Sequence, residues 1–239
     1  MGMLMARVGG EIAPSRINIG GIAEMMRSAV EALIGAPSMS LMTFKCPSGG
    51  GKFFACDDEE MPPIAEIEGI IISAHYNNVY WSAPMGEGNR EPDCVSRDGL
   101  SGWYMEDGEE MERSCAACPY NKMGSAPKGK GKACRNRVEL LMLVEGSALP
   151  VKISVPTMSV ENYGRYYTRE LIPRGVKNPW QVSTKITLKN TANAAGTKYA
   201  QMIFSCTGRT DDAQMAELIR DVVPILMGSA AAKGGQADE

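Results

Sequence analysis

"VELLMLVEGSALPVKISVP", residues 138 to 156, carries the strongest strand signal in this 239-residue chain. Two runs rich in aliphatic and β-branched side chains, 138–146 and 150–156, meet around Gly146 and Ser147. Apolar runs of this length on either side of turn residues are typical of paired β-strands. We therefore expect a strand pair here, within a mainly β fold.

Further strands are expected on both sides of this pair. Residues 40–46 read as one short strand, and residues 67–84 as two strands joined by a turn at Asn77-Asn78. Downstream, residues 180–190 alternate between apolar and polar side chains, which indicates a half-exposed antiparallel strand with a polar, basic open face. Residues 198–206 are expected to pair with it.

Three helices are expected at the periphery. Residues 20–35 place apolar side chains at helical spacing. A second helix is expected over residues 159–171, with Ser159 as its N-cap. A last helix is expected from residue 211 to the proline at position 224, with Thr210 as its cap. Short strands with a few helices predict an α+β, mainly β protein, and specifically an OB-like small β-barrel.

The chain is divided accordingly into four segments. An N-terminal arm and helix (1–39) precede the OB-like core (40–210), and a C-terminal helix with a disordered tail (211–239) follows it. Residues 84–137 interrupt the core as an insert rich in Gly, Pro, Cys and charge, without sustained periodicity. Such a segment lacks the apolar residues for a core of its own, so we expect another constraint to hold it together.

The cysteines of the insert supply that constraint. Cys94, Cys115, Cys118 and Cys134 form the pattern C-x20-C-x2-C-x15-C. A C-x2-C pair holds two sulfurs on one tight turn, and two more distant thiolates complete a tetrahedral site for Zn²⁺. A structural zinc site supplies on the order of 10 kcal/mol of apparent folding free energy. The pattern therefore predicts a structural, non-catalytic zinc ion in a four-cysteine module.

Other uses of these thiols are weighed against zinc. Disulfides conflict with a reducing compartment, and a thioredoxin-like C-x-x-C belongs at a helix start, whereas this one lies among Gly, Pro and Lys. An iron–sulfur cluster takes the same ligands and remains an alternative. His75, the one histidine, is an alternative ligand, although its apolar strand context favours a structural role.

Charge is segregated along the sequence. The net charge is −3, yet the windows 114–138 and 171–210 hold 12 of the 25 basic residues and none of the 28 acidic ones. Segregation of this kind focuses a positive field on part of a surface. The alternative for the lysines between Cys118 and Cys134 is a solvated, flexible loop.

A basic surface with aromatic side chains is the combination that binds single strands, because phosphates are neutralised while bases stack. The predicted cationic contacts are Lys122, Lys128, Lys130, Lys132, Arg135, Arg137, Lys177, Lys185 and Lys189. The predicted stacking residues are Tyr76, Tyr80, Trp81 and Trp180.

Several function classes find little support. No apolar run approaches the roughly 20 residues of a membrane span, and the N-terminus lacks the apolar stretch of a signal peptide, so we expect a cytoplasmic protein without membrane contact. "CPSGGGKFF" (46–54) fails the phosphate-loop motif at both ends. With a single histidine we expect no catalytic set, and a metal-dependent nuclease using an acid such as Asp98 is the enzymatic alternative.

Three cysteine-bearing stretches of the sequence resemble those of a known group of proteins. "CAACPYNKMGS" (115–125), "GKGKACRN" (129–136) and "PDCVSRDGLSG" (92–102) resemble a segment shared by phage and prophage proteins, and the expected architecture is similar to phage single-stranded DNA-binding (helix-destabilising) proteins. Those proteins use one histidine with three cysteines, whereas this chain offers four cysteines.

The resemblance implies sequence-nonspecific binding of single-stranded DNA in phage-type replication or recombination. It implies residence in the cytoplasm of a bacterial host and contacts with replication or recombination proteins. The alternative function is a zinc-stabilised adaptor that recruits replication, recombination or transcription partners.

Overall fold

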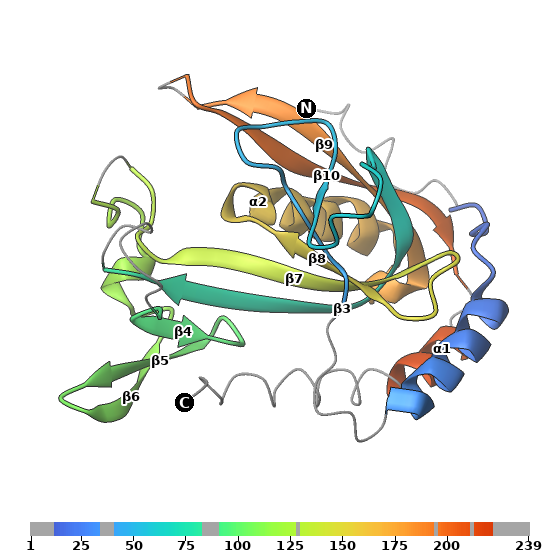
Figure 1. The fold of residues 1–239 in the computed structure, drawn as a ribbon, viewed down its shortest axis with the longest axis horizontal. Helices are drawn as coiled ribbons and strands as arrows, with labels where there is room; N and C mark the ends of the chain where they lie inside the picture. The colour runs from blue at the N-terminus through green and yellow to red at the C-terminus, as the bar shows by residue number, and fades with distance from the viewer. Residues whose placement is uncertain are drawn as a thin grey trace, which may run out of the picture. The chain divides into compact units, whose positions relative to one another are not determined.

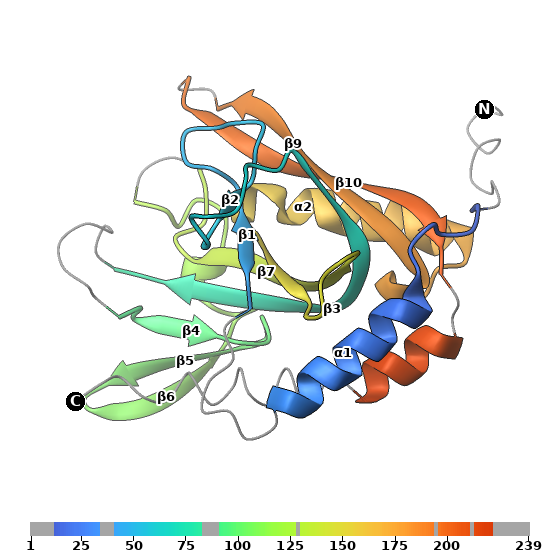
Figure 2. The same ribbon diagram turned by 45° about the vertical axis from the view of Figure 1, so that its right-hand side comes forward.

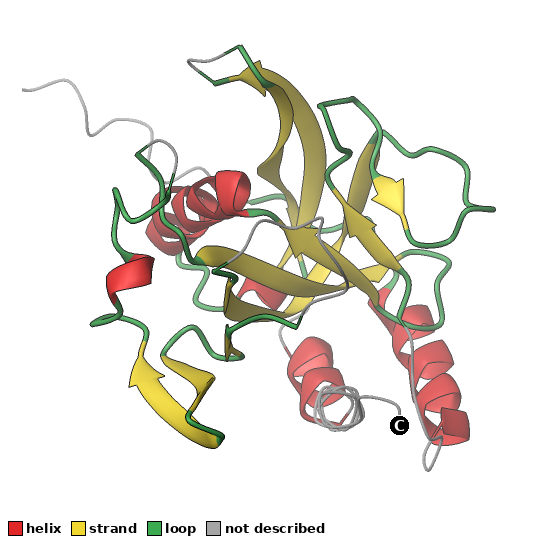
Figure 3. Cartoon of the chain, turned by 60° about the vertical axis from the view of Figure 1, so that its left-hand side comes forward, coloured by secondary structure: helices red, strands yellow, loops and turns green. Residues whose placement is uncertain are grey.

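The computed structural model describes residues 12–33, 41–82, 91–127, 130–193, 196–210 and 213–221. Strands predominate over helices (Figures 1 and 3), so the expectation of a mainly β protein with a few helices is confirmed. The described strands form one mixed sheet in the order β2-β1-β8-β7-β3-β4-β5-β6, with β9 pairing with β3 and β10 pairing with β9. Among these strands no pairing joins the sheet's ends, so the sheet is open and the expected OB-like closed barrel is not observed.

The chain divides into two compact units, which are described separately. The first comprises Met1–Ser73, Leu140–Ser154 and Glu161–Glu239; the second comprises Ala74–Glu139 and Val155–Val160. The insert expected at residues 84–137 lies within the second unit, which also takes in the end of one long strand and the start of another.

The strands of the first unit include the pair predicted from residues 138–156. Residues Leu140 to Leu143 of β7 are all buried, as in a strand covered on both faces. β1 pairs in parallel with β8 and antiparallel with β2, while β9 pairs antiparallel with β10 and with the start of β3. The strand bounds are β1 Thr43–Lys45, β2 Ala55–Cys56, β3 Glu66–Tyr80, β7 Arg135–Val144, β8 Val151–Val155, β9 Val182–Ala192 and β10 Lys198–Arg209.

Two helical segments pack on one face of the first unit's strands. The predicted helix is α1 (Ile19–Leu33), and residues 213–221 form the second segment, beside α1 in Figures 1 and 2. Met26 of α1, Ile70 of β3 and Leu218 lie in one apolar cluster and are all 1% exposed or less. The cluster also includes partly buried Trp180. Both segments are thus held by their apolar stripes.

A third helix starts earlier than the sequence suggested. α2 (Thr157–Arg165) begins two residues before Ser159, which is fully buried inside the helix and is not its N-cap. The helix continues as a π-helical turn, Tyr166–Leu171, and the Tyr166 hydroxyl shares a hydrogen bond of 2.8 Å with Thr184 Oγ1. Two short 3-10 turns follow, Ile172–Arg174 and Pro179–Gln181.

The second unit is more regular than the sequence suggested. β4 (Cys94–Ser96), β5 (Ser101–Glu106) and β6 (Glu109–Ser114) form an antiparallel meander that continues from the end of β3. Asp107 (φ 53°) and Gly108 (φ 86°) make the tight turn between β5 and β6, where both residues need a left-handed backbone. A short 3-10 turn, Pro119–Asn121, follows the C-x-x-C pair.

The turn expected at Asn77-Asn78 was wrong. β3 runs without a break through both residues, and Asn78 is 6% exposed. Asn78 lies inside the strand because its side chain finds two partners in the second unit: it donates to Gly99 O (3.3 Å) and accepts from Asn136 Nδ2 (2.5 Å). These bonds satisfy the Asn78 amide within the strand, whereas Asn77 Oδ1 is buried without a hydrogen-bond partner among the described residues.

In the part of the chain that the structure describes, no helix is both long enough and apolar enough to cross a bilayer.

Candidate functional site

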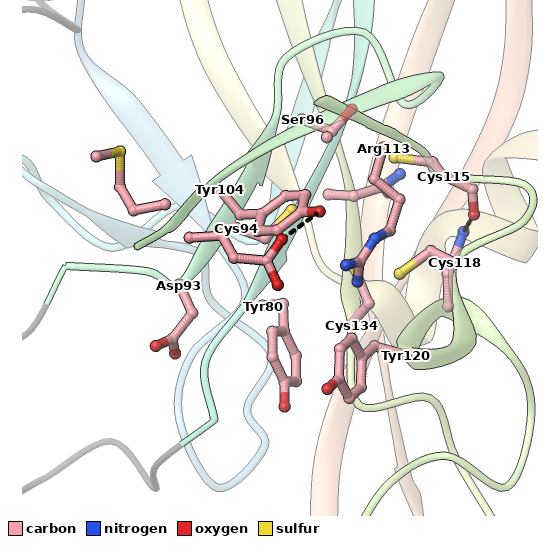
Figure 4. A pocket seen from close by; sticks show the side chains of 15 residues that line it. Tyr80, Asp93, Cys94, Ser96, Tyr104, Arg113, Cys115, Cys118, Tyr120 and Cys134 are labelled. Atoms are coloured by element: carbon pink, nitrogen blue, oxygen red, sulfur yellow. Dashed lines mark hydrogen bonds between the residues drawn. The ribbon is translucent and has the colours of Figure 1, made fainter. Parts of the chain in front are cut away.

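The four cysteines of the predicted metal site line a single pocket in the second unit (Figure 4). Cys94 opens β4, Cys115 follows the end of β6, Cys118 precedes the 3-10 turn, and Cys134 precedes β7. All four thiols are free, and Cys115, Cys118 and Cys134 are buried. Residues 40 positions apart in the sequence thus converge on one cavity.

The pKa values of the thiols reflect this convergence. Burial raises the pKa of Cys134 to about 11, and repulsion by Cys118, Cys115 and Cys94 adds to the shift. The pKa of Cys94 is likewise raised, mainly by burial and then by Cys115 and Cys118. Cys94 and Cys134 are thus both affected by the neighbouring thiols Cys115 and Cys118.

Gly102 of β5 provides the space between two of the sulfurs. A Cβ built on this glycine would lie 2.8 Å from Cys94 Sγ and 3.7 Å from Cys115 Sγ. Any side chain at this position would therefore occupy the space beside these two sulfurs, which we call the cradle.

Backbone hydrogen bonds fix the loops that carry the cysteines. The amide of Cys115 donates to Leu100 O (2.7 Å), and the amide of Cys134 donates to Tyr120 O (2.9 Å). The amide of Asn121 donates to Cys118 O (3.1 Å), which closes the 3-10 turn after the C-x-x-C pair. The cysteine-bearing segments are therefore tied to β5 and to one another by their main chains.

The chemistry of these donors fits a zinc ion. Four thiols and no carboxylate-rich alternative match the soft, tetrahedral ligand set that Zn²⁺ takes in structural sites. Within the described residues, however, no three or more His, Cys, Asp or Glu side chains are placed so that they could hold a metal ion. The sulfurs share the pocket with the Arg113 side chain, which lies between Tyr104 and Cys118 in Figure 4, 4.3 Å from the centre of the Tyr104 ring. The fit thus rests on the donor set and the cradle at Gly102.

His75 lies on β3 and is not among the residues that line the pocket.

An amide network braces the knuckle, which we define as residues 115–121. Lys132 Nζ donates to Asn121 Oδ1 (3.0 Å) and Asn136 Oδ1 (2.9 Å). Asn136 Nδ2 in turn donates to Asn121 Oδ1 (3.0 Å), and Asn121 Nδ2 donates to Cys115 O (2.9 Å). Lys132 was predicted as a phosphate contact, but its ammonium group is engaged inside the second unit.

Replacing Lys132 by methionine is expected to lower the free energy of unfolding of the second unit by about 2 to 3 kcal/mol, because two amide oxygens lose a charged donor. Lys130→Met is the matched control, because Lys130 is exposed and its loss is expected to cost under about 0.5 kcal/mol. Urea denaturation of the zinc-loaded variants, followed by hydrogen exchange, measures both. Equal stabilities would show that Lys132 is another surface lysine.

The other predicted cations of the second unit lie between Cys118 and Cys134 or in the first residues of β7. Lys122, Lys130 and Arg135 are exposed, and Arg137 is half-buried. Lys128 lies outside the described residues.

The predicted aromatic residues of the second unit are paired or exposed. Tyr76 is 47% exposed on β3. Tyr80 stacks on Tyr120 with ring centroids 4.2 Å apart and an interplanar angle of 12°. The Arg135 guanidinium lies over the Trp81 ring at 5.2 Å from its centre. Tyr80 and Trp81 thus each combine a π-face with a neighbouring ring or cation, whereas Tyr76 is an exposed ring.

The predicted residues of the first unit do not form a comparable set. Lys185 pairs with Glu66 (3.0 Å) and Glu68 (3.3 Å) across β3 and β9, so the basic face expected on β9 is neutralised there. Trp180 packs against the apolar cluster. Lys177 and Lys189 are exposed.

Asp98, the acid considered for a nuclease, is a turn residue. Its Oδ1 accepts hydrogen bonds from the amides of Leu100 (2.7 Å) and Ser101 (2.9 Å) and from the Ser96 hydroxyl (3.1 Å). The two amide bonds, led by that of Ser101, lower the pKa of Asp98. The described residues hold no cluster of acids around it that would bind a metal.

Sequence reasoning missed the residues that line the pocket between the cysteines. Tyr104, Arg113 and Tyr120 make the ring contacts described above, and Asn121 and Asn136 form the amide network. The asparagines sit three residues after Cys118 and two after Cys134, a spacing that signals second-sphere support once the ligands are assigned.

Comparison with protein-family models, with curated proteins and with solved structures gives no match, so the geometry of this site carries its interpretation.

Proposed function

We propose that this chain is a zinc-stabilised protein that binds single-stranded DNA without sequence preference and serves phage-type replication or recombination. The observation that carries the proposal is the group of aromatic and basic side chains around the four-cysteine pocket of the second unit. The exposed cations and the acidic tip of the β5–β6 hairpin indicate how a DNA strand would lie on this surface.

The aromatic residues supply the stacking component. Tyr76 is 47% exposed, and the Trp81 ring is partly exposed with the Arg135 guanidinium over it at 5.2 Å. Base–aromatic stacking contributes about 1 to 3 kcal/mol per base and does not depend on base identity. Two such rings account for binding without sequence readout.

The exposed cations supply the electrostatic component. Lys122 and Lys130 lie on the loop between Cys118 and Cys134, and Arg135 directly follows it. The tip of the β5–β6 hairpin is acidic, with Glu106, Asp107, Glu109, Glu110 and Glu112. A phosphate backbone is repelled by that tip, so we infer that the strand follows the cysteine-bearing loops instead.

The zinc ion would be held by Cys94, Cys115, Cys118 and Cys134, and would fix the shape of these loops without taking part in a reaction. Between Cys115 and Cys134 the described residues form no regular element beyond one 3-10 turn. A metal crosslink stiffens such loops and keeps their cations in place.

Titration with an unstructured oligonucleotide at several salt concentrations tests the proposal. Tryptophan fluorescence is expected to report binding whose logarithmic salt slope is about −2, since Lys122, Lys130 and Arg135 each contribute about 0.7 on a single strand. Arg135→Ala is expected to reduce both the affinity and the slope. The control is Arg220→Ala, because Arg220 is 74% exposed and pairs with Asp221 on a helix of the first unit. Affinity that does not change with salt would contradict the proposal.

A second candidate, an interaction adaptor, is favoured by exposed apolar side chains on the second unit. Leu100 is 72% exposed, Met105 is 65% exposed and Trp103 is 45% exposed. Trp103 and Met105 face Glu112 and Glu110 across the β5–β6 ladder. In that case the same titration would give weak, salt-insensitive DNA binding, and Trp103→Ala would abolish binding to a protein partner while leaving zinc content unchanged.

A further inference from the structure

The first unit carries a glycine turn that the proposed single-strand surface does not use. Residues 48–53 connect β1 to β2, and Gly49 (φ 75°) and Gly50 (φ 88°) both adopt the left-handed backbone. Consecutive residues of this kind direct main-chain amides toward one concave side, where anions bind. A Cβ built on Gly49 meets nothing within 4 Å, so this side of the turn is open.

The turn is anchored to the β9–β10 hairpin. The amide of Gly51 donates to Asn190 Oδ1 at 2.7 Å. A Cβ on Gly50 would lie 3.2 Å from that same oxygen and 3.5 Å from the Tyr199 backbone, so the turn approaches the hairpin closely only because no side chain intervenes. The concave side is therefore fixed by contacts within one unit.

A hollow of about 460 Å³ lies between the turn and the hairpin. This volume is within the range of small-ligand sites, roughly 300 to 1,000 Å³. The described residues that line it include no acid and one cation, Lys198; they are Gly49, Gly50, Gly51, Asn190, Thr191, Ala192 and Lys198. Lys52 and Lys189, each next in sequence to a lining residue, are exposed. The hollow thus carries one cation, Lys198, on a largely apolar lining.

Phe53, two residues after the lining residue Gly51, carries an exposed aromatic ring. Phe53 is 54% exposed, whereas its neighbour Phe54 is 5% exposed and belongs to the core. An exposed phenylalanine beside lysines offers a stacking face, and the glycine amides with Lys198 offer a phosphate contact. Phe53 replaces the Ser or Thr that would bind Mg²⁺ in a phosphate loop, so the geometry does not suit a triphosphate.

We propose that this turn binds one nucleotide unit of single-stranded DNA, with the phosphate against the amides of Gly49 and Gly50 and the Lys198 ammonium group, and the base on Phe53. The inference rests on the proposed function, since it adds a second contact for the same strand. It names residues of the first unit alone, so the two claims are tested by different variants.

Phe53→Ala is expected to weaken oligonucleotide binding by roughly 5- to 150-fold, the equivalent of one lost base stack. Lys198→Ala is expected to lower the logarithmic salt slope by about 0.7, the contribution of one phosphate contact. Ile172→Ala is the matched control, because Ile172 is 51% exposed on the first unit and away from the turn in sequence. Thermal melting of each variant checks that the fold is retained.

Thymidine monophosphate and inorganic phosphate are titrated in parallel. Loss of oligonucleotide binding in Phe53→Ala and Lys198→Ala, with little binding of either small molecule, supports the inference. If both variants bind the oligonucleotide as the wild type does while Arg135→Ala weakens it, the inference is overturned and the proposed function stands. If the wild type binds only the mononucleotide or phosphate, the site serves a free ligand, and both claims about a strand fail.

Discussion

Cys118→Ser is expected to reduce the zinc content from one ion per chain to far below one and to unfold the second unit. Serine is not a zinc ligand in structural sites, and a three-thiolate remnant leaves the tetrahedron open. Because a structural zinc ion contributes on the order of 10 kcal/mol of apparent folding free energy, its loss exceeds the stability of a small unit. Metal analysis after gel filtration measures the zinc, and hydrogen exchange over residues 74–139 measures the unfolding.

Cys206→Ser is the matched control for this experiment. Cys206 is a free, half-buried thiol on β10 of the first unit and does not line the pocket. The control is expected to retain zinc and protection in the second unit. A Cys118→Ser variant that keeps a full equivalent of zinc, or keeps its protection without the metal, would contradict the role assigned to the four cysteines.

Gly69→Ala is expected to have the second largest effect, a loss of about 3 to 4 kcal/mol in the unfolding free energy of the first unit. A Cβ on Gly69 would overlap the carbonyl oxygen of Leu143 and lie 3.0 Å from its carbonyl carbon. Backbone atoms of two paired strands, β3 and β7, cannot yield as a side-chain tip does. The added methyl group must therefore separate the strands at the centre of this unit.

Gly164→Ala is the control for an added methyl group. Gly164 lies in α2, and a Cβ built there meets nothing within 4 Å. Alanine in an open helical position is expected to stabilise the chain by about 0.5 to 1 kcal/mol. Urea denaturation of both variants gives the comparison, and equal midpoints would show that β3 and β7 do not approach as closely as described.

The periodic segments were the most predictable parts of the fold. The helix expected at 20–35 is α1, and the pair expected at 180–190 and 198–206 is β9 and β10. These segments bury one face, so their side-chain periods follow the structure directly. The neutralisation of the basic face expected on β9 was not predictable, because the partners of Lys185 lie on β3, more than 100 residues earlier.

Local signals failed where distant contacts decide the backbone. Asn77-Asn78 resembles a hairpin turn, yet Asn78 is a strand residue because Asn136 and Gly99 satisfy its amide. The open sheet, found in place of the expected barrel, was not predictable for a similar reason, since strand order depends on pairings such as β1 with β8. Neither the hydrogen bonds of Asn78 nor the pairing of β1 with β8 can be inferred from the spacing of apolar residues.

The candidate site was predictable in part. The spacing of the four cysteines led to one pocket, and the same spacing could not reveal that Lys132 faces inward. Lysines that alternate with glycine look alike in the sequence, and only the positions of Asn121 and Asn136 distinguish one of them. Only the three-dimensional structure therefore distinguishes a lysine available for a phosphate contact from Lys132, which braces the knuckle.

X-ray absorption at the zinc edge of the purified, reduced protein tests the central claim most directly. One zinc ion per chain with four sulfur neighbours at about 2.3 Å is the expected result. A protein that binds no zinc, or a spectrum dominated by oxygen and nitrogen neighbours, would contradict it.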